Sequence, residues 1–265
     1  MAISPADALA AVERSPAAFT VHDRQAWVDA FTSDGVVEDP VGSQPHRGTG
    51  GLTAFYDTFI GPRDITFHRD VDLVVDSTVI RDLELEVAMA AGLTMYIPAY
   101  LCYRLADDRG EVRIAELQAF WELPAMVGQF ARSGARAVPA GLQLTRDLLV
   151  NQGPAGAVGF LSGFRGTGAR GKRHFRQFLT DARVGDEVAM RRWLGKGARI
   201  TAGDRTPMSS AELLTRLVGA QPRKVIASGH CLVAGIDRSD GRDVLIADVA
   251  AKPFAIERIR YFSQA

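Results

Sequence analysis

Four stretches that follow one another closely decide the fold: ITFHRDVDLVV (residues 65–75), STVIRDLELEVAMA (77–90), TMYIPAYLCYRL (94–105) and VRIAELQAFWE (112–122). Each combines β-branched, aromatic and aliphatic residues over the length of a long strand, and turn residues at 107–110 separate the last two. The sequence therefore predicts four consecutive long strands.

The residues before these strands predict helices. Residues 7–31 are rich in Ala, with apolar side chains at helical spacing, interrupted near Pro16 and restarted at Asp23, a good N-cap. A short strand at 36–37, a turn-rich segment at 40–51 and a helix at 52–59 follow. Helices followed by a run of antiparallel strands indicate an α+β fold, because a doubly wound sheet would alternate the two.

Composition points to a globular protein that binds its ligand in a pocket. Of the 265 residues, 47% are hydrophobic, and 31 Lys and Arg balance 31 Asp and Glu. No net field attracts nucleic acid or a membrane surface. Cys102 and Cys231 lie far apart in apolar runs and are expected to be reduced core residues. Residues 1–9 show neither a basic region nor a long apolar run, which predicts a cytoplasmic protein.

The C-terminal part repeats the same plan. Helices are expected at 172–182 and 186–194, a short strand at 198–201, a helix at 210–218, and long strands at 224–237, 243–251 and 255–262. This similar order and spacing predicts two copies of one fold. The expected domains are 1–124 and 166–265, joined by a helical connector over 125–165. Two interpretations are open for the connector: helices packed between domains, or an amphipathic lid or membrane-touching segment.

The most informative motif is Val36-Val37-Glu38-Asp39-Pro40-Val41-Gly42-Ser43-Gln44-Pro45, followed by Gly48 and Ala54-Phe55-Tyr56. It resembles the signature of the ketosteroid isomerases, in which a strand ending in Glu-Asp-Pro-Val-Gly-Ser carries the general base. Residues 22–24 and 119–121 also resemble members of the broader nuclear transport factor 2-like, or SnoaL-like, family. The resemblance covers roughly residues 10–125. It implies two tandem cone-shaped (cystatin-like) domains, each a curved antiparallel sheet packed on its N-terminal helices.

Moving a double bond next to a carbonyl requires a carboxylate that removes a carbon-bound proton inside a dry pocket. Alternation along the strand places Asp39 and Val37 on one face and Glu38 on the other. By resemblance, Asp39 is the expected base and Glu38 points outward. The alternative is that Asp39 only caps the turn before Pro40.

The mechanism also needs donors for the developing oxyanion. The resemblance to ketosteroid isomerases implies an oxyanion hole built from a Tyr and a protonated Asp. By resemblance the Tyr position falls on Ser15, and residues 97–102 contain no carboxylate. Tyr56 and Tyr100 are the phenols that remain, as donors or as ordinary core aromatics. Trp121, Phe55 and Val37 are expected to bind the substrate.

The second copy offers weaker candidates. Its base position falls near Ala202, with Asp204 two residues away, whereas Asp248 lies in an apolar strand where the family has its late acid. Asp248 is a candidate buried acid or a solvent-facing one, and His230 is a candidate pocket residue or a structural one.

The remaining motifs do not predict a nucleotide, nucleic-acid or metal site. Residues 166–171 fit GxGxxG but follow no strand, so they do not predict dinucleotide binding. The basic run at 170–176 is typical of a solvated helix face rather than a nucleic-acid site. No cluster of metal-ligand spacing occurs, so neither a metal nor another cofactor is expected.

The expected function is a steroid Δ-isomerase-like enzyme that acts on a steroid or polycyclic ketone. One alternative is a polyketide cyclase or epoxide hydrolase of the SnoaL-like class, which would need Glu86 or Glu116 to face Asp39. The other is a non-catalytic binding protein for a hydrophobic small molecule. A homodimer, or an intramolecular pseudo-dimer of the two domains, is the expected assembly.

Overall fold

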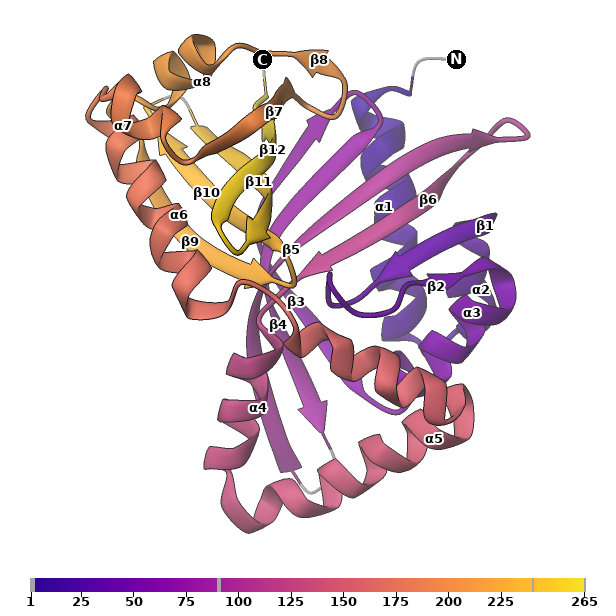
Figure 1. The fold of residues 1–265 in the computed structure, drawn as a ribbon. Helices are drawn as coiled ribbons and strands as arrows, with labels where there is room; N and C mark the ends of the chain where they lie inside the picture. Colours follow the sequence, from indigo (N-terminus) through magenta and orange to yellow (C-terminus); the bar gives the residue numbers. More distant parts are fainter. Residues whose placement is uncertain (1–2, 90–91, 240, 265) are drawn as a thin grey trace. The chain divides into compact units, whose positions relative to one another are not determined.

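The computed structural model describes residues 3–89, 92–239 and 241–264. The chain forms two compact units, Met1–Phe164 and Arg165–Ala265. Each unit has helices ahead of a six-stranded sheet (Figure 1), which confirms the α+β class. Ala90, where the second predicted strand was expected to end, and the outermost residues of the expected domains lie outside the described residues.

The first unit begins with helices that pack on its sheet. These helices are α1 (Pro5–Thr20), α2 (Arg24–Asp29), α3 (Gly48–Phe55) and the π-helix η1 (Tyr56–Ile60). The Ser4 side chain caps α1 by accepting a hydrogen bond from the backbone of Asp7, at 3.1 Å. One face of α1 buries small and apolar side chains, which include Ala8, Val12 and Phe19, against the sheet. The predicted pair of helices before residue 31 is confirmed.

The first sheet is mixed, with the order β2-β1-β6-β5-β4-β3. Its strands are β1 (Phe31–Glu38), β2 (His46–Arg47), β3 (Asp64–Val75), β4 (Thr78–Met89), β5 (Leu93–Asp108) and β6 (Glu111–Phe120). β1 pairs with β6 in parallel, whereas the other neighbours are antiparallel. β1 thus begins well before the short strand predicted at 36–37.

Further helical segments complete the first unit: α4 (Leu123–Arg132), the 3₁₀ turns η3 (Gly134–Arg136) and η4 (Ser162–Phe164), and α5 (Ala137–Leu161) between these two turns. Gly153 breaks α5 with a φ of 68° and is followed by Pro154. This is a left-handed backbone conformation that favours glycine. The chain can therefore turn back within α5.

The second unit repeats the first. Its elements are α6 (Gly168–Arg183), α7 (Glu187–Arg191), β7 (Leu194–Ala202), β8 (Thr206–Pro207), α8 (Ser210–Leu217), β9 (Gln221–Ser228), β10 (Cys231–Arg238), β11 (Gly241–Ala251) and β12 (Phe254–Phe262). The sheet order β8-β7-β12-β11-β10-β9 copies that of the first unit strand for strand. This correspondence fits a tandem duplication.

The single strand predicted at 224–237 is wrong, because the chain makes a hairpin there. β9 ends at Ser228 and β10 starts at Cys231, with Gly229 and His230 in the turn. Gly229 has a φ of 56°. A Cβ on Gly166 would lie 2.1 Å from the carbonyl oxygen of Gly229, so the first glycine of the GxGxxG stretch lets the backbone approach this turn.

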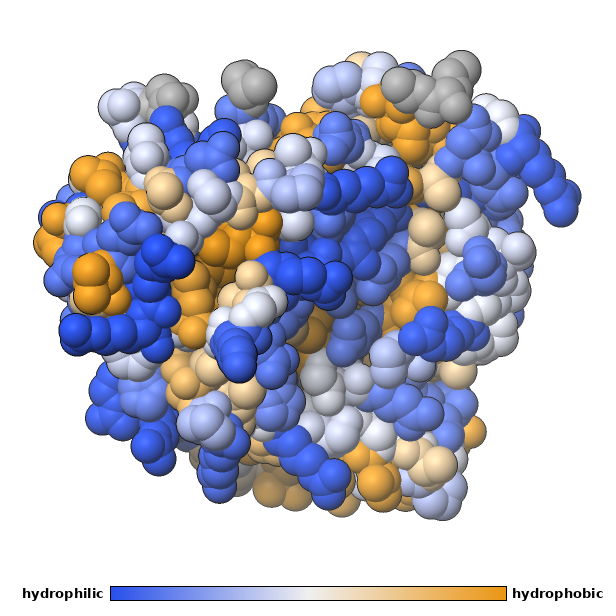
Figure 2. All heavy atoms as spheres, turned by 45° about the horizontal axis from the view of Figure 1, so that its top comes forward, coloured by the Kyte–Doolittle hydropathy of each residue, from blue (hydrophilic) through white to orange (hydrophobic). Residues whose placement is uncertain are grey.

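The surface carries many hydrophilic side chains with apolar areas between them (Figure 2). Within the described part of the chain, no helix has the length and apolar character to cross a membrane.

Candidate functional site

The first unit contains an apolar pocket of about 450 Å³, a size typical of small-molecule sites. Most of its lining is aliphatic or aromatic, from the concave face of β3–β6 and from the helices. The few lining side chains with polar atoms, among the described residues, are those of Ser15, Trp27, Asp39, Arg63, Tyr103, Trp121 and Thr145. The pocket thus joins a large apolar surface to a small set of polar groups.

The segment expected to be a connector contributes to this pocket. Lining side chains come from α4 (Met126, Phe130), from α5 (Leu144, Phe160) and from Phe164. Phe160 packs on Phe59 of η1 with ring centroids 5.3 Å apart. In Figure 1, α4 and α5 lie beside the ends of β3 and β4. These helices therefore act as a lid over the pocket of the first unit.

Asp39 follows β1 and lines the pocket. Its Oδ1 accepts a hydrogen bond from the indole Nε1 of Trp121 at 2.5 Å. Burial raises the pKa of Asp39 from 3.8 to about 6, and the Trp121 hydrogen bond acts in the opposite direction by stabilising the carboxylate. A carboxyl with this pKa is mostly ionised at pH 7 and is a stronger base than an ordinary Asp.

The pocket phenol on β5 is Tyr103, which sequence analysis missed. Odd-numbered residues of β5, which include Met95, Ile97 and Leu101, line the pocket together with Tyr103. Alternation places the predicted Tyr100 on the opposite face of the strand. Counting in steps of two from Ile97 would have selected Tyr103 from the sequence.

Tyr103 lies in a charged as well as an apolar environment. Burial raises the pKa of its hydroxyl; nearby Arg81 opposes this, whereas Asp72, Glu13 and Asp39 add to it. The guanidinium of Arg81 is itself held by Asp72, through Nε and Nη2 at 2.8 and 2.9 Å. Tyr103 therefore stays a neutral hydrogen-bond donor at physiological pH.

The remaining predicted residues of the first unit separate into two groups. Trp121 and Phe55 line the pocket, as does Ser15, the residue at which the resemblance predicted the family Tyr position. Val37 lies in the core at 0% exposure. Tyr56 packs on Trp27 with ring centroids 5.6 Å apart, and its buried hydroxyl has no hydrogen-bond partner among the described residues; it is not one of the described pocket-lining residues.

Glu38, Glu86 and Glu116 do not face Asp39. Glu38 accepts hydrogen bonds from the Gly42 backbone at 2.9 Å and from Gln118 at 3.2 Å. Glu86 contacts His68 at 2.7 Å, and Glu116 pairs with Arg104. In their strands, Glu86 and Glu116 alternate with the pocket-lining residues and so project to the other face of the sheet. The paired-carboxylate arrangement expected for the cyclase or hydrolase class is not formed by these residues.

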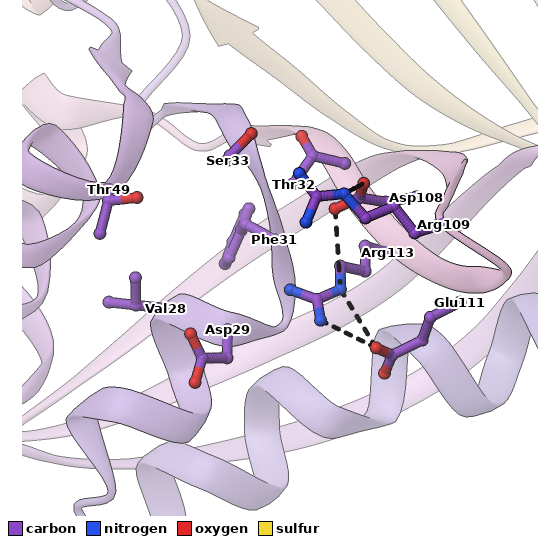
Figure 3. A pocket seen from close by; sticks show the side chains of 10 residues that line it. All are labelled: Val28, Asp29, Phe31, Thr32, Ser33, Thr49, Asp108, Arg109, Glu111 and Arg113. Atoms are coloured by element: carbon purple, nitrogen blue, oxygen red, sulfur yellow. Dashed lines mark hydrogen bonds and ion pairs between the residues drawn. The ribbon is translucent and has the colours of Figure 1, made fainter.

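A second pocket of about 350 Å³ in the first unit is more polar (Figure 3). Arg113 donates to Glu111 through Nε and Nη2 at 3.2 and 2.9 Å, and its Nε lies 3.9 Å from Asp108. These charges largely neutralise one another. The apolar pocket is the stronger candidate site.

In the second unit, the predicted acid and histidine lie near one end of the β10–β11 pair. Asp248 accepts a hydrogen bond from the Cys231 thiol at 3.1 Å, and the exposed His230 occupies the β9–β10 turn. On β11, Leu245 and Ala247 face the core, and alternation places Asp243 on their side of the strand. Asp243 is 5% exposed and accepts a hydrogen bond from the Tyr261 hydroxyl. The core-facing acid of this strand is therefore Asp243.

No group of three or more His, Cys, Asp or Glu residues that could hold a metal ion occurs among residues 3–89, 92–239 and 241–264.

Comparison with known proteins finds similar proteins for the first unit. Residues 12–116 match the family model described as a SnoaL-like domain. A Δ5-3-ketosteroid isomerase from Mycobacterium sp. is 29% identical, over 45% of this chain and 96% of that one, with a TM-score of 0.42. A Mycobacterium tuberculosis protein solved in complex with estradiol-17β-hemisuccinate is 24% identical, over 44% and 95%, with a TM-score of 0.41.

An epoxide hydrolase/cyclase-like enzyme with a role in pyran ring formation in the polyether salinomycin is 19% identical, over 44% of this chain and 92% of that one, with a TM-score of 0.40. These likenesses cover less than half of the chain. The family match and the two sheets with the same strand order agree on the architecture. Residues 12–116 of the first unit are thus similar to a SnoaL-like domain.

Proposed function

We propose that the first unit isomerises a steroid-like or other polycyclic ketone by moving a double bond. One observation carries this proposal: among the described residues, the carboxyl that lines the apolar pocket is that of Asp39, and burial raises its pKa to about 6. Such a group can take a proton from carbon and return it, because its basicity is matched to neutral pH.

In the proposed reaction, the Asp39 carboxylate removes the proton from the carbon between the carbonyl group and the double bond. The electron pair of the broken C–H bond moves into a dienolate, whose oxygen accepts a hydrogen bond from the Tyr103 hydroxyl. Asp39 then delivers the proton to the far carbon of the former double bond. The product is the conjugated ketone, and no other reactant is consumed.

The lid supports this chemistry physically. Phe130, Leu144 and Phe160 cover the pocket with apolar side chains. Exclusion of water strengthens the hydrogen bond to the dienolate and keeps the basicity of Asp39 high.

Activity is expected to depend on pH through Asp39. Because the reaction needs the ionised carboxyl and its pKa is about 6, kcat/KM should rise with pH through about 6 and then level off. Initial rates between about pH 4.5 and 8 on a β,γ-unsaturated ketosteroid measure this rise, which is the acid limb of the pH profile. A limb centred near pH 4, the ordinary range of Asp, would contradict the buried setting of this base.

Removal of the indole donor is expected to shift that limb. In Trp121→Phe the carboxylate loses the hydrogen bond that lowers its pKa, so the limb should move to higher pH by on the order of one unit. Trp193→Phe is a matched control, because that indole donates to Asp181 of the second unit at 2.8 Å. An unchanged limb in Trp121→Phe would show that this contact does not set the pKa of Asp39.

A non-catalytic binding protein is the second candidate function. The observation that favours it is Ser15, which lines the pocket at the place of the family Tyr and leaves Tyr103 as the phenolic donor. Turnover of a β,γ-unsaturated ketosteroid in stopped assays distinguishes the two. If the native chain binds the ketosteroid but converts it no faster than Asp39→Asn does, the binding protein is the better assignment.

A further inference from the structure

A buried cation lines the apolar pocket. Arg63 lies between η1 and β3, and its side chain is only 7% exposed. Its place in the pocket lining brings a full positive charge to a surface made mostly of aliphatic and aromatic groups. Such a charge is costly to bury without matching acceptors.

The protein satisfies this guanidinium only in part. Nη1 donates to the carbonyl oxygen of Thr58 at 2.5 Å. The paired carboxylate is Asp147 of α5, whose Oδ2 lies 3.9 Å from Nη2, beyond hydrogen-bond distance. This Oδ2 is buried and has no hydrogen-bond partner among the described residues. Arg63 thus keeps N–H donors for a further acceptor, since a guanidinium carries five.

Arg63 and Asp39 lie at different levels of the sheet. The register of the sheet locates both groups along β5. Asp39 bonds to Trp121, and the residue before Trp121, Phe120, pairs with Tyr100 of β5. Arg63 precedes Asp64, which is linked through its partner Ala88 to Thr94 of β5. The six residue-to-residue steps from Thr94 to Tyr100 span about 20 Å of strand. A ligand that contacts both groups must therefore be elongated.

We propose that Arg63 binds a carboxylate at the end of the ligand remote from Asp39, so that the natural ligand is an elongated apolar molecule with an acidic terminus. A carboxylate matches the planar fork of the guanidinium with two parallel hydrogen bonds, which a single neutral acceptor does not. That one end of this ligand is a ketone follows from the proposed function, whereas the acidic end is inferred from Arg63 alone.

Asp147 gives the proposal a second, opposite test. Its carboxylate competes with the ligand for Arg63 and repels a second negative charge in the same place. Removing the negative charge of Asp147 should therefore favour an acidic ligand, whereas removing the positive charge of Arg63 should disfavour it.

The experiment compares dissociation constants of acids and their methyl esters for the full chain, by calorimetry at pH 7. One pair is a steroid with a carboxylated side chain and its ester; the other is a long-chain fatty acid and its ester. The native chain is expected to bind each acid about tenfold more tightly than its ester. Arg63→Met should abolish this preference, and Asp147→Asn should increase it. Arg24→Met, a change at an exposed arginine of the same unit, should leave it unchanged.

The outcomes separate the two proposals. Acid preference in the fatty pair alone supports the Arg63 site and argues against a polycyclic ligand. Equal binding of acid and ester by the native chain overturns the Arg63 site and leaves the polycyclic ligand intact. Equal weakening of acid and ester in Arg63→Met assigns this arginine to holding the lid and overturns the proposal. Failure of all four probes to bind overturns both.

Discussion

Replacing Asp39 by Asn is expected to lower kcat/KM for isomerisation of a β,γ-unsaturated ketosteroid by about 10²- to 10⁴-fold, the usual contribution of a general base. The amide has nearly the shape of the carboxyl, and its oxygen can still accept the hydrogen bond of Trp121. The loss therefore measures proton transfer rather than disruption of the pocket. Initial rates at pH 7.5, above the pKa of about 6, test this directly.

The same substitution is expected to stabilise the fold at neutral pH. In the folded chain the pKa of Asp39 is raised from 3.8 to about 6, so ionisation is less favourable in the folded state than in the unfolded state. The contribution of Asp39 to stability is then most favourable below about pH 4, decreases as pH rises to about 6, and is constant above that. Two pKa units correspond to about 3 kcal/mol. Asp39→Asn should raise the free energy of unfolding at pH 7 by this amount, as measured by chemical denaturation.

A change at the neighbouring carboxyl provides the control. Glu38→Gln removes a negative charge one residue away, but Glu38 contacts the Gly42 backbone and Gln118 rather than the pocket. Its kcat/KM should stay within a few-fold of the native value, and no gain of stability from desolvation is expected. If Asp39→Asn and the native chain had equal rates, Asp39 would have no role in proton transfer.

Much of the first unit could be predicted because its local signals agree. The strand run at 65–122 and the Glu38-Asp39-Pro40 motif are local patterns, and both the α+β class and the position of Asp39 at a pocket follow from them. The duplication was also visible, since the order of helices and strands repeats. The hairpin at Gly229 was missed because the apolar runs on both sides look continuous, and only the glycine and its polar neighbours marked the turn.

The lid and the pocket polar groups were harder to predict because they depend on tertiary contacts. Residues 125–165 are rich in Ala, Gly and Leu, and nothing in that composition tells which surface they cover. Arg63 and Asp147 lie far apart in the sequence, and only the fold brings them within 3.9 Å. Tyr100 was selected by its place in the motif alignment, whereas the pleat of β5 turns Tyr103 into the pocket.

Substitution of Tyr103 by Phe is expected to lower kcat by about 10²- to 10³-fold, the usual effect of removing one oxyanion donor. Tyr103 is the phenol that lines the pocket with Asp39, and a developing dienolate needs a donor more than the ground-state ketone does. KM should therefore change little. Steady-state kinetics above pH 7, where Asp39 is ionised, separate the two parameters.

The companion variant Tyr100→Phe distinguishes the phenol chosen from the motif from the phenol chosen by strand alternation. Both changes remove one hydroxyl from β5, three residues apart, but Tyr100 lies on the face of the strand opposite the pocket-lining residues. A large loss of kcat in Tyr103→Phe with a small one in Tyr100→Phe supports Tyr103 as the donor. The reverse result would contradict it. Small losses in both would show that neither phenol stabilises the dienolate, which would contradict the role of Tyr103.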